Sequence, residues 1–357
     1  MGLPVNDTAT SASADATVAR ILQFYCPFTA ESNPEGSEIL RATTDWAARY
    51  DLGAGDLGKT EMLAQTGVAY TVCATPHARG ALAQALSDYN AWAWAINDFV
   101  GSATGTAATV YRLGRWERIT RSPGSWRGEG DLFEAAGSEV LDRIRGLVTP
   151  VQWQRFAAGQ SQWIQAMAWE VAIRELARPL GVNEYVAMRI SCVGVYAATS
   201  YFDMTEAIEL SEAQWSDPLV RAAVEAGAFA GGLDNDRYSY LREKDLAITK
   251  NSIFTAIATD HPDLTAYEVV DRAIGLRDAC LTQYLHLRDR ALNAAGDELQ
   301  QYLRAVDLMI GGNLNFAVMG IRYHHPAVAG ALTITADPPH TTVARPHIPT
   351  IEWWWAL

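Results

Sequence analysis

Apolar and polar positions along this chain follow the pattern of amphipathic helices, as in the segment SEILRATTDWAARY at residues 37–50. The chain is rich in Ala and poor in β-branched clusters bounded by turn residues, which favours helix over sheet. The pattern predicts further helices over residues 59–73, 80–100, 132–147, 150–178, 183–210, 217–244, 265–295 and 297–321.

Turn and breaker residues separate these helices. Ser37 is the expected N-cap of the first helix, and Pro76 interrupts the chain after the second. Pro179 and Gly181 end the helix predicted over residues 150–178, which is rich in Trp. The stretch 101–131 is rich in Gly, Ser, Thr and Arg, and we expect it to contain loop.

No internal repeat or linker splits the chain, so we expect one all-α bundle over residues 20–330. Residues 1–19 are rich in Ser, Ala, Thr and Asp and are expected to be disordered. Residues 331–357 are expected to form a C-terminal tail. With 357 residues, 49% of them hydrophobic, the chain is long enough for one large domain.

Charge and cysteine usage narrow the function classes. The net charge is −13 and the isoelectric point is near 5.0, without the basic stripe that binding of nucleic acid requires. The chain contains no run of 18 apolar residues, so no membrane-spanning helix is predicted. The N-terminus lacks the pattern of a secretory signal. The four cysteines form no C-x-x-C pair and indicate reduced thiols in a cytoplasmic protein.

The segment LDNDRYSYLREKD, residues 233–245, carries the strongest chemical signal. Asn235, Ser239 and Glu243 follow one another at four-residue intervals, so a helix places all three on one face. An amide oxygen, a hydroxyl and a carboxylate are hard ligands that suit Mg²⁺ sharing its shell with phosphate and water. Arg242 could pair with the same phosphate.

This segment resembles the second metal-binding motif of bacterial class I terpene synthases, N-D-x-x-S-x-x-x-E with a basic residue before the Glu. Two further features match that family. Arg189 lies 46 residues before Asn235, where the family has an arginine that senses diphosphate. Arg322 and Tyr323 match the family's Arg-Tyr pair, which also bonds diphosphate.

The resemblance covers nearly the whole chain and implies the class I terpenoid synthase fold, a single-domain helical bundle. It also implies an Mg²⁺-dependent cyclase, with three ions, that ionises a linear prenyl diphosphate and cyclises the carbocation. By analogy, a C15 or C20 substrate (farnesyl or geranylgeranyl diphosphate) is favoured over C10. The partner is this small molecule, with no nucleic acid and no membrane, and the oligomeric state stays open, with a homodimer among the alternatives.

The family's aspartate-rich motif is degraded in the segment AWAWAINDFVGSAT. Asp98 is the only carboxylate there, and Gly101 and Ser102 replace the downstream acid. Two alignments are open: Asn97 and Asp98 stand for the Asp-Asp pair, or Asp98 is itself the first aspartate. We favour the second alignment slightly and expect Asp98 to be the metal ligand facing the cavity, across its mouth from Asn235.

A carbocation needs a dry cavity with aromatic faces, because water would quench it and aromatic rings can stabilise it. Trp94, Phe99 and Phe316 are the candidates, although core packing is the commoner role of any one aromatic residue. Asn315 is polar within an apolar run and either faces the pocket or bonds to backbone. The pair His324 and His325 is interpreted as a loop element rather than a metal site.

Other functions are less well supported. Prenyl-chain elongation would require two D-D-x-x-D motifs and a protonation-initiated cyclase would require D-x-D-D, and the sequence contains neither. The degraded acidic motif supports the remaining alternative, a non-catalytic helical protein that binds prenyl diphosphates.

Overall fold

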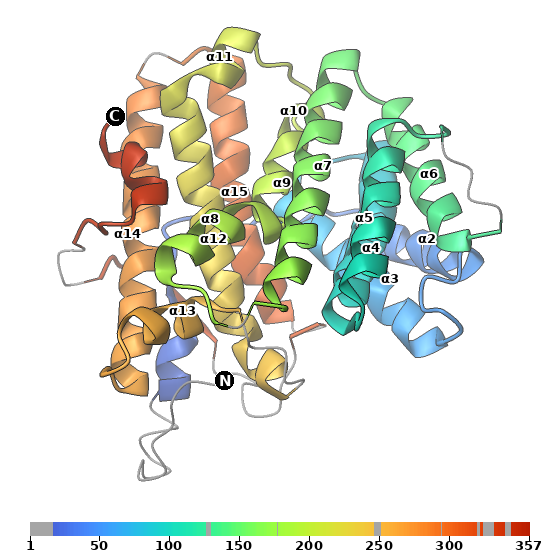
Figure 1. Cartoon of the computed structure of the whole chain (residues 1–357). Coiled ribbons are helices and arrows are strands. Elements are labelled where there is room, and N and C mark those ends of the chain that lie inside the picture. The colour runs from blue at the N-terminus through green and yellow to red at the C-terminus, as the bar shows by residue number, and fades with distance from the viewer. Residues whose placement is uncertain are drawn as a thin grey trace.

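The computed structural model describes residues 17–125, 130–176, 178–245, 251–293, 295–319, 322–323, 332–339 and 344–357. Nearly all of the regular structure in these residues is helical, and Figure 1 shows the long helices running along a common direction in one bundle. The predicted all-α class is confirmed. The N-terminal half contributes α2 (Gly36–Arg49), α3 (Leu57–Ala74), α4 (Gly80–Ser102), α5 (Thr106–Arg121), α6 (Leu132–Arg145) and α7 (Pro150–Ile173).

The C-terminal half is more interrupted. It contains α8 (Val182–Cys192), α9 (Val195–Ala198), the 3-10 helix η1 (Thr199–Tyr201), α10 (Phe202–Thr205), α11 (Glu212–Ser216), α12 (Pro218–Asp245), α13 (Ile253–Asp260), α14 (Ala266–Leu292) and α15 (Asp297–Met319). Two short strands, β1 (Gln23–Tyr25) and β2 (Thr333–Thr335), pair in parallel. The 3-10 helix η3 (Pro349–Trp355) follows near the end of the chain.

Several predicted boundaries differ from the structure. The stretch 101–131 contains loop, as expected, but also the whole of α5, whose buried face comes from Leu113, Trp116 and Ile119 at helical spacing. The arginines and threonines of α5 lie between these positions and hide the pattern. The predicted helix 183–210 is wrong as a single element, because it is divided after Cys192 and again after Ala198.

Other differences are smaller. The first helix begins at Gly36 after Glu35, so Ser37 is not its N-cap. The short helices α11 and α13 were not predicted, because five and eight residues are too few to show helical periodicity clearly. Residues 17–21, expected to be disordered in part, are helical.

The packing of α3 against α4 fixes the position of a helix that borders the site. A Cβ atom on Gly67 of α3 would lie 2.4 Å from the backbone nitrogen of Ala91 on α4. Only glycine permits this approach of the two helices. Further along α4, Trp92 is fully buried and donates a hydrogen bond of 3.0 Å to the carbonyl of Phe133.

Both ends of the described chain pack on the bundle. Arg277 of α14 donates to the carbonyl of Tyr25 in β1 at 2.5 Å and to Asp234 of α12 at 2.7 Å. In η3, Trp354 is fully buried and its indole donates to Glu225 at 2.9 Å. The segment treated as a tail therefore contributes to the core where it is described. No described helix is long and apolar enough to cross a membrane.

Candidate active site

Two adjoining cavities open between α4, α7, α8 and α12. The first is polar, has a volume of about 280 Å³ and is lined by charged side chains: Arg174, Arg189, Arg242, Arg322, Glu170, Asp236 and Glu243. The second is mostly apolar and smaller, with a volume of about 70 Å³. Trp94, Asn97, Val193 and Asn235 line both, so the two cavities share a wall. We call them the polar cavity and the apolar cavity.

The α12 residues predicted to hold metal lie on one face of that helix. Asn235 and Glu243 line the polar cavity, and Ser239 is buried between them in sequence. The Ser239 hydroxyl makes no hydrogen bond of standard geometry in the described part of the chain, although it lies close enough to Glu243 to lower the pKa of that carboxyl. Burial has the larger effect and raises the pKa of Glu243 overall. This set of amide, hydroxyl and carboxylate oxygens fits a hard divalent cation.

Arg189 is held in place by its neighbours. Its Nη2 lies 2.6 Å from Asp236 Oδ1 and donates to Asn235 Oδ1 at 2.8 Å. Burial acts to lower the pKa of Arg189, but the charge of Asp236, together with smaller contributions from neighbours such as Tyr185, outweighs it, so the pKa lies well above its usual value. The guanidinium therefore stays charged although it is buried, and it faces the polar cavity.

Asp236 was missed in the sequence as a site residue. Its carboxylate accepts hydrogen bonds from the hydroxyl of Tyr185 and from the backbone nitrogen of Ile253, the latter at 3.0 Å. It thereby connects α8, α12 and α13 around Arg189. In the sequence, the only sign of its role is its position next to Asn235. The direction in which the Asp236 side chain points depends on how α12 packs against its neighbours, which the sequence does not show.

Arg322 and Tyr323 reach the same cavity from a distant part of the chain. Tyr323 accepts a hydrogen bond of 3.1 Å from Asn235 Nδ2. The Arg322 guanidinium lies over the ring of Trp94, 4.5 Å from its centroid, and its Nε is buried without a hydrogen bond in the described residues. Arg242 is nearby: burial lowers its pKa, and the positive charge of Arg322 lowers it further. The site thus gathers arginines that would repel one another without an anion.

The residues of α4 are arranged differently from the favoured alignment. Asp98 lines neither cavity, and its carboxylate forms an ion pair with Arg322. Asn97 lines both cavities instead. Consecutive helical residues point about 100° apart, so the two cannot share one direction. Of the two residues, Asn97 is therefore the one whose side chain faces the cavities in this structure.

Of the three candidate aromatic residues, two line the apolar cavity and one does not. Trp94 and Phe316 line the apolar cavity, and their rings are stacked with centroids 6.0 Å apart. Phe99 is not in the lining: its ring packs 5.2 Å from that of Trp116 on α5. Phe99 lies five residues after Trp94 and points to another side of α4, so in this structure it does not face the apolar cavity. Asn315 contacts Cys73 and also lies outside the lining.

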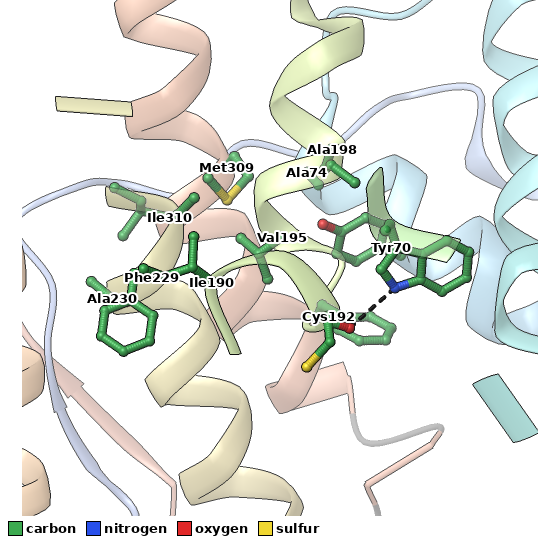
Figure 2. Packing of buried hydrophobic residues seen from close by; sticks show 14 of the residues in the cluster. Tyr70, Ala74, Ile190, Cys192, Val195, Ala198, Phe229, Ala230, Met309 and Ile310 are labelled. Atoms are coloured by element: carbon green, nitrogen blue, oxygen red, sulfur yellow. Dashed lines mark hydrogen bonds between the residues drawn. The ribbon is translucent and has the colours of Figure 1, made fainter. Parts of the chain in front are cut away.

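Other residues of the apolar cavity were not singled out in the sequence. Tyr70, Val195 and Ala198 are in its lining, and Figure 2 shows them among the buried residues packed in this part of the bundle. The backbone break before α9 occurs at Gly194, whose φ of +80° is in the left-handed region that favours glycine. Two polar side chains in the lining are paired: Tyr89 donates to Gln160 at 2.8 Å, and Gln160 donates to the carbonyl of Ala197 at 2.9 Å.

Within the described ranges, no three His, Cys, Asp or Glu side chains are grouped so as to hold a metal ion. The four cysteines are buried and free. The pair His324 and His325 lies outside the described residues. Among the described residues, the α12 face therefore remains the best candidate for a metal site.

Comparisons with known proteins agree with this site. The family described as Terpene synthase family 2, C-terminal metal binding, matches residues 88–283. The diterpene cyclase DtcycB of a Streptomyces species is 37% identical over 337 residues, 94% of this chain and 97% of that relative. The spiroviolene synthase of Streptomyces violens is 27% identical over 93% of this chain and 95% of its own.

Solved structures show the same architecture. The SVS_A2 protein from ancestral sequence reconstruction matches with a TM-score of 0.81 and 25% identity, covering 93% of this chain and 98% of its own. The α-eudesmol synthase matches with a TM-score of 0.72 and 19% identity, covering 82% of this chain and 98% of its own, which supports the fold alone. From the family match and the relative that is 37% identical over nearly its full length, we conclude that this chain belongs to the bacterial class I terpene synthases and is a terpene cyclase.

Proposed function

We propose that this cyclase uses Mg²⁺ to convert a linear prenyl diphosphate, farnesyl or geranylgeranyl diphosphate, into a cyclic sesquiterpene or diterpene with release of diphosphate. One observation carries the proposal: a polar cavity lined by arginines adjoins an apolar cavity lined by aromatic rings. The first suits a diphosphate and the second a hydrocarbon chain. The relative named a diterpene cyclase favours the C20 substrate, geranylgeranyl diphosphate.

We infer three Mg²⁺ ions, as the family resemblance implies. One of them would be held by the α12 residues Asn235, Ser239 and Glu243. When bound, Mg²⁺ would neutralise diphosphate charge and make it a better leaving group. Asn235 Oδ1 is engaged by Arg189 in this structure. For Asn235 to become a ligand, Arg189 must release that oxygen, and a phosphate oxygen would give the guanidinium a new partner.

The other side chains bind the anion and protect the cation. Arg189, Arg242 and Arg322, with the hydroxyl of Tyr323, would fix the diphosphate at the mouth of the apolar cavity. Trp94 and Phe316 would face the carbocation and contribute about 1–2 kcal/mol each through cation–π attraction. The hydrogen bonds that pair Tyr89 and Gln160 occupy their polar atoms, which leaves fewer groups to bind water near the cation.

The test is incubation of the purified chain with Mg²⁺ and C10, C15 and C20 prenyl diphosphates. Released diphosphate is quantified and the extracted hydrocarbons are identified by gas chromatography and mass spectrometry. We expect release with a cyclic product, greatest with the C20 substrate, and a fall of at least about 100-fold in Glu243→Gln at an unchanged melting temperature. Binding of the substrates without release would support the non-catalytic alternative instead.

A further inference from the structure

The helix that carries the aspartate-rich motif in the family brings no carboxylate to the polar cavity here. From α4, the lining contains Trp94, Asn97 and Gly101. A Cβ atom on Gly101 would meet nothing within 4 Å, so open space lies in front of that position. A divalent cation bound near α4 would have only an amide oxygen from this helix, and neutral ligands alone hold Mg²⁺ weakly.

A carboxylate reaches the same cavity from α7. Glu170 lines the polar cavity, and its side chain is 26% exposed. The neighbouring Arg174 donates from Nη1 to the carbonyl of Val100 at 2.6 Å, which joins the end of α7 to the end of α4 beside Gly101. Glu170 is therefore held close to the side of the cavity where α4 lacks an acid.

The ion pair between Glu170 and Arg174 is weak, so the Glu170 carboxylate can still bind another cation. The distance from Arg174 Nη2 to Glu170 Oε1 is 3.6 Å, and pairs at this helical spacing are weak. Glu170 of α7 and Glu243 of α12 both line the polar cavity, and the buried Ser239 lies on the same α12 face as Glu243. Two carboxylates in the wall of one cavity, supplied by different helices, can receive a divalent cation between them.

We propose that Glu170 is a carboxylate ligand of the divalent metal site at the mouth of the polar cavity, supplied by α7 in place of the acid that α4 has lost. The inference rests on the proposed function, because it deepens the description of the same site. It assigns to α7 a role that the motifs of α4 and α12 do not predict.

The test measures the affinity of the protein for Mn²⁺ in the presence of inorganic diphosphate. Electron paramagnetic resonance detects the free and bound Mn²⁺. We expect Glu170→Gln to weaken Mn²⁺ binding by at least about tenfold, as loss of a metal ligand does, with the melting temperature of the metal-free protein unchanged. Glu175→Gln is the matched control, because Glu175 is exposed just beyond α7 and lies outside the cavity lining. That variant should bind Mn²⁺ as the unaltered protein does.

Returning an acid to α4 gives a second readout. The double variant Glu170→Gln with Gly101→Asp should recover most of the lost Mn²⁺ affinity, since Gly101 has room for a side chain on the cavity side. Mn²⁺ affinity in Glu170→Gln within twofold of the unaltered protein would overturn the inference. An equal loss in Arg174→Gln would also overturn it, since Glu170 would then act only by holding that arginine.

These measurements need no turnover. A chain that binds Mn²⁺ through Glu170 but forms no product would contradict the proposed function alone. A chain that forms product while Glu170→Gln keeps full Mn²⁺ affinity would contradict this inference alone.

Discussion

At the mouth of the cavity, two consecutive residues of α4 have separate tasks. Asn97 lines both cavities, whereas the carboxylate of Asp98 pairs with Arg322. Burial acts to lower the pKa of Arg322, but its interactions with Tyr323 and Asp98 outweigh burial and raise the pKa. Asp98 therefore holds Arg322 in position at the polar cavity, while the side chain of Asn97 faces both cavities.

The first prediction separates these tasks by their dependence on Mg²⁺. Asn97→Ala should raise the Mg²⁺ concentration for half-maximal activity by about tenfold, because a metal-facing oxygen is lost. Asp98→Asn should leave that concentration within about twofold and raise KM for the prenyl diphosphate by about tenfold, because Arg322 loses its charged partner. The measurement is steady-state kinetics at varied concentrations of Mg²⁺ and substrate. If Asp98→Asn raised the Mg²⁺ concentration for half-maximal activity more than Asn97→Ala does, the two roles would be reversed.

The second prediction concerns the aromatic residues. Phe316→Leu should change the ratio of products by about tenfold, because about 1–2 kcal/mol of cation stabilisation is removed from one branch of the cyclisation. Phe99→Leu is the matched control, since its ring packs on Trp116 outside the cavities. Product analysis by gas chromatography should show the same ratio for Phe99→Leu as for the unaltered enzyme. A shift in both variants, or in neither, would contradict the placement.

At the scale of elements, the break between α8 and α9 determines which groups face the apolar cavity. Gly194 adopts its φ of +80° at the end of the helix that carries Arg189, and Gly194 and Val195 both line the apolar cavity. A side chain at this position is strained in the left-handed region even where space is available, as it is here, 3.6 Å from Trp163 Nε1.

The third prediction compares two glycines. Gly194→Ala should lower the free energy of unfolding by about 1–2 kcal/mol because of backbone strain. Gly275→Ala should have the opposite sign, about 0.5–1 kcal/mol more stable, because Gly275 is exposed within α14, has an ordinary φ and has open space around it. Urea unfolding measures both. Equal effects of the two substitutions would contradict the account of the break.

Some elements were predictable from periodicity and others were not. The buried stripes of α12 and α15 extend over many turns, and the predicted ranges 217–244 and 297–321 lie within a few residues of Pro218–Asp245 and Asp297–Met319. In α5, Trp116 and Leu113 are too few among polar residues for the pattern to be recognised. At the division of 183–210, the indole of Trp163 donates a hydrogen bond of 3.1 Å to the carbonyl of Cys192, a tertiary contact that local periodicity does not encode.

At the scale of the whole molecule, the site is assembled from segments far apart in the sequence. The motifs identified Asn235, Glu243, Arg189 and Arg322, and the structure brings them to one cavity. The contributions of Asp236 and Glu170 could not be predicted, because single acids carry no motif and their direction depends on how α7, α8 and α12 pack. For the same reason, the sequence could not decide between Asn97 and Asp98.

A histidine outside the linings of the two cavities also joins distant parts of the bundle. His77, between α3 and α4, lies 2.9 Å from Glu206 and 3.2 Å from Glu31, and Arg304 of α15 lies 3.3 Å from Glu31. Burial acts to lower the pKa of His77, but the hydrogen bonds and charges of the two glutamates outweigh it and raise the pKa. The hydrogen bond from His77 is the largest cause that lowers the pKa of Glu31.

The fourth prediction follows from the sign of these shifts. Because the folded pKa of His77 is raised, its contribution to stability is present below the unfolded pKa of about 6.5 and is lost as the pH rises through the folded pKa. The lowered pKa of Glu31 makes the contribution decrease again in strong acid. The difference in free energy of unfolding between the unaltered protein and His77→Gln should therefore be larger at about pH 6 than at about pH 8.5.

Urea titrations at the two pH values measure this difference. His286→Gln is the control, since His286 is exposed on α14, and it should show the same small effect at both. A His77→Gln difference that does not change with pH would contradict the proposed ion pairs.

The central claim is that this site holds a divalent metal and a diphosphate together. The most direct measurement is a crystal structure with Mn²⁺ and inorganic diphosphate, in which anomalous scattering locates the metal. The account predicts Mn²⁺ bound by oxygens of Asn235, Ser239 and Glu243, with diphosphate oxygens in hydrogen-bonding distance of Arg189, Arg242 and Arg322. Mn²⁺ bound away from the α12 face, or a diphosphate outside the polar cavity, would contradict it.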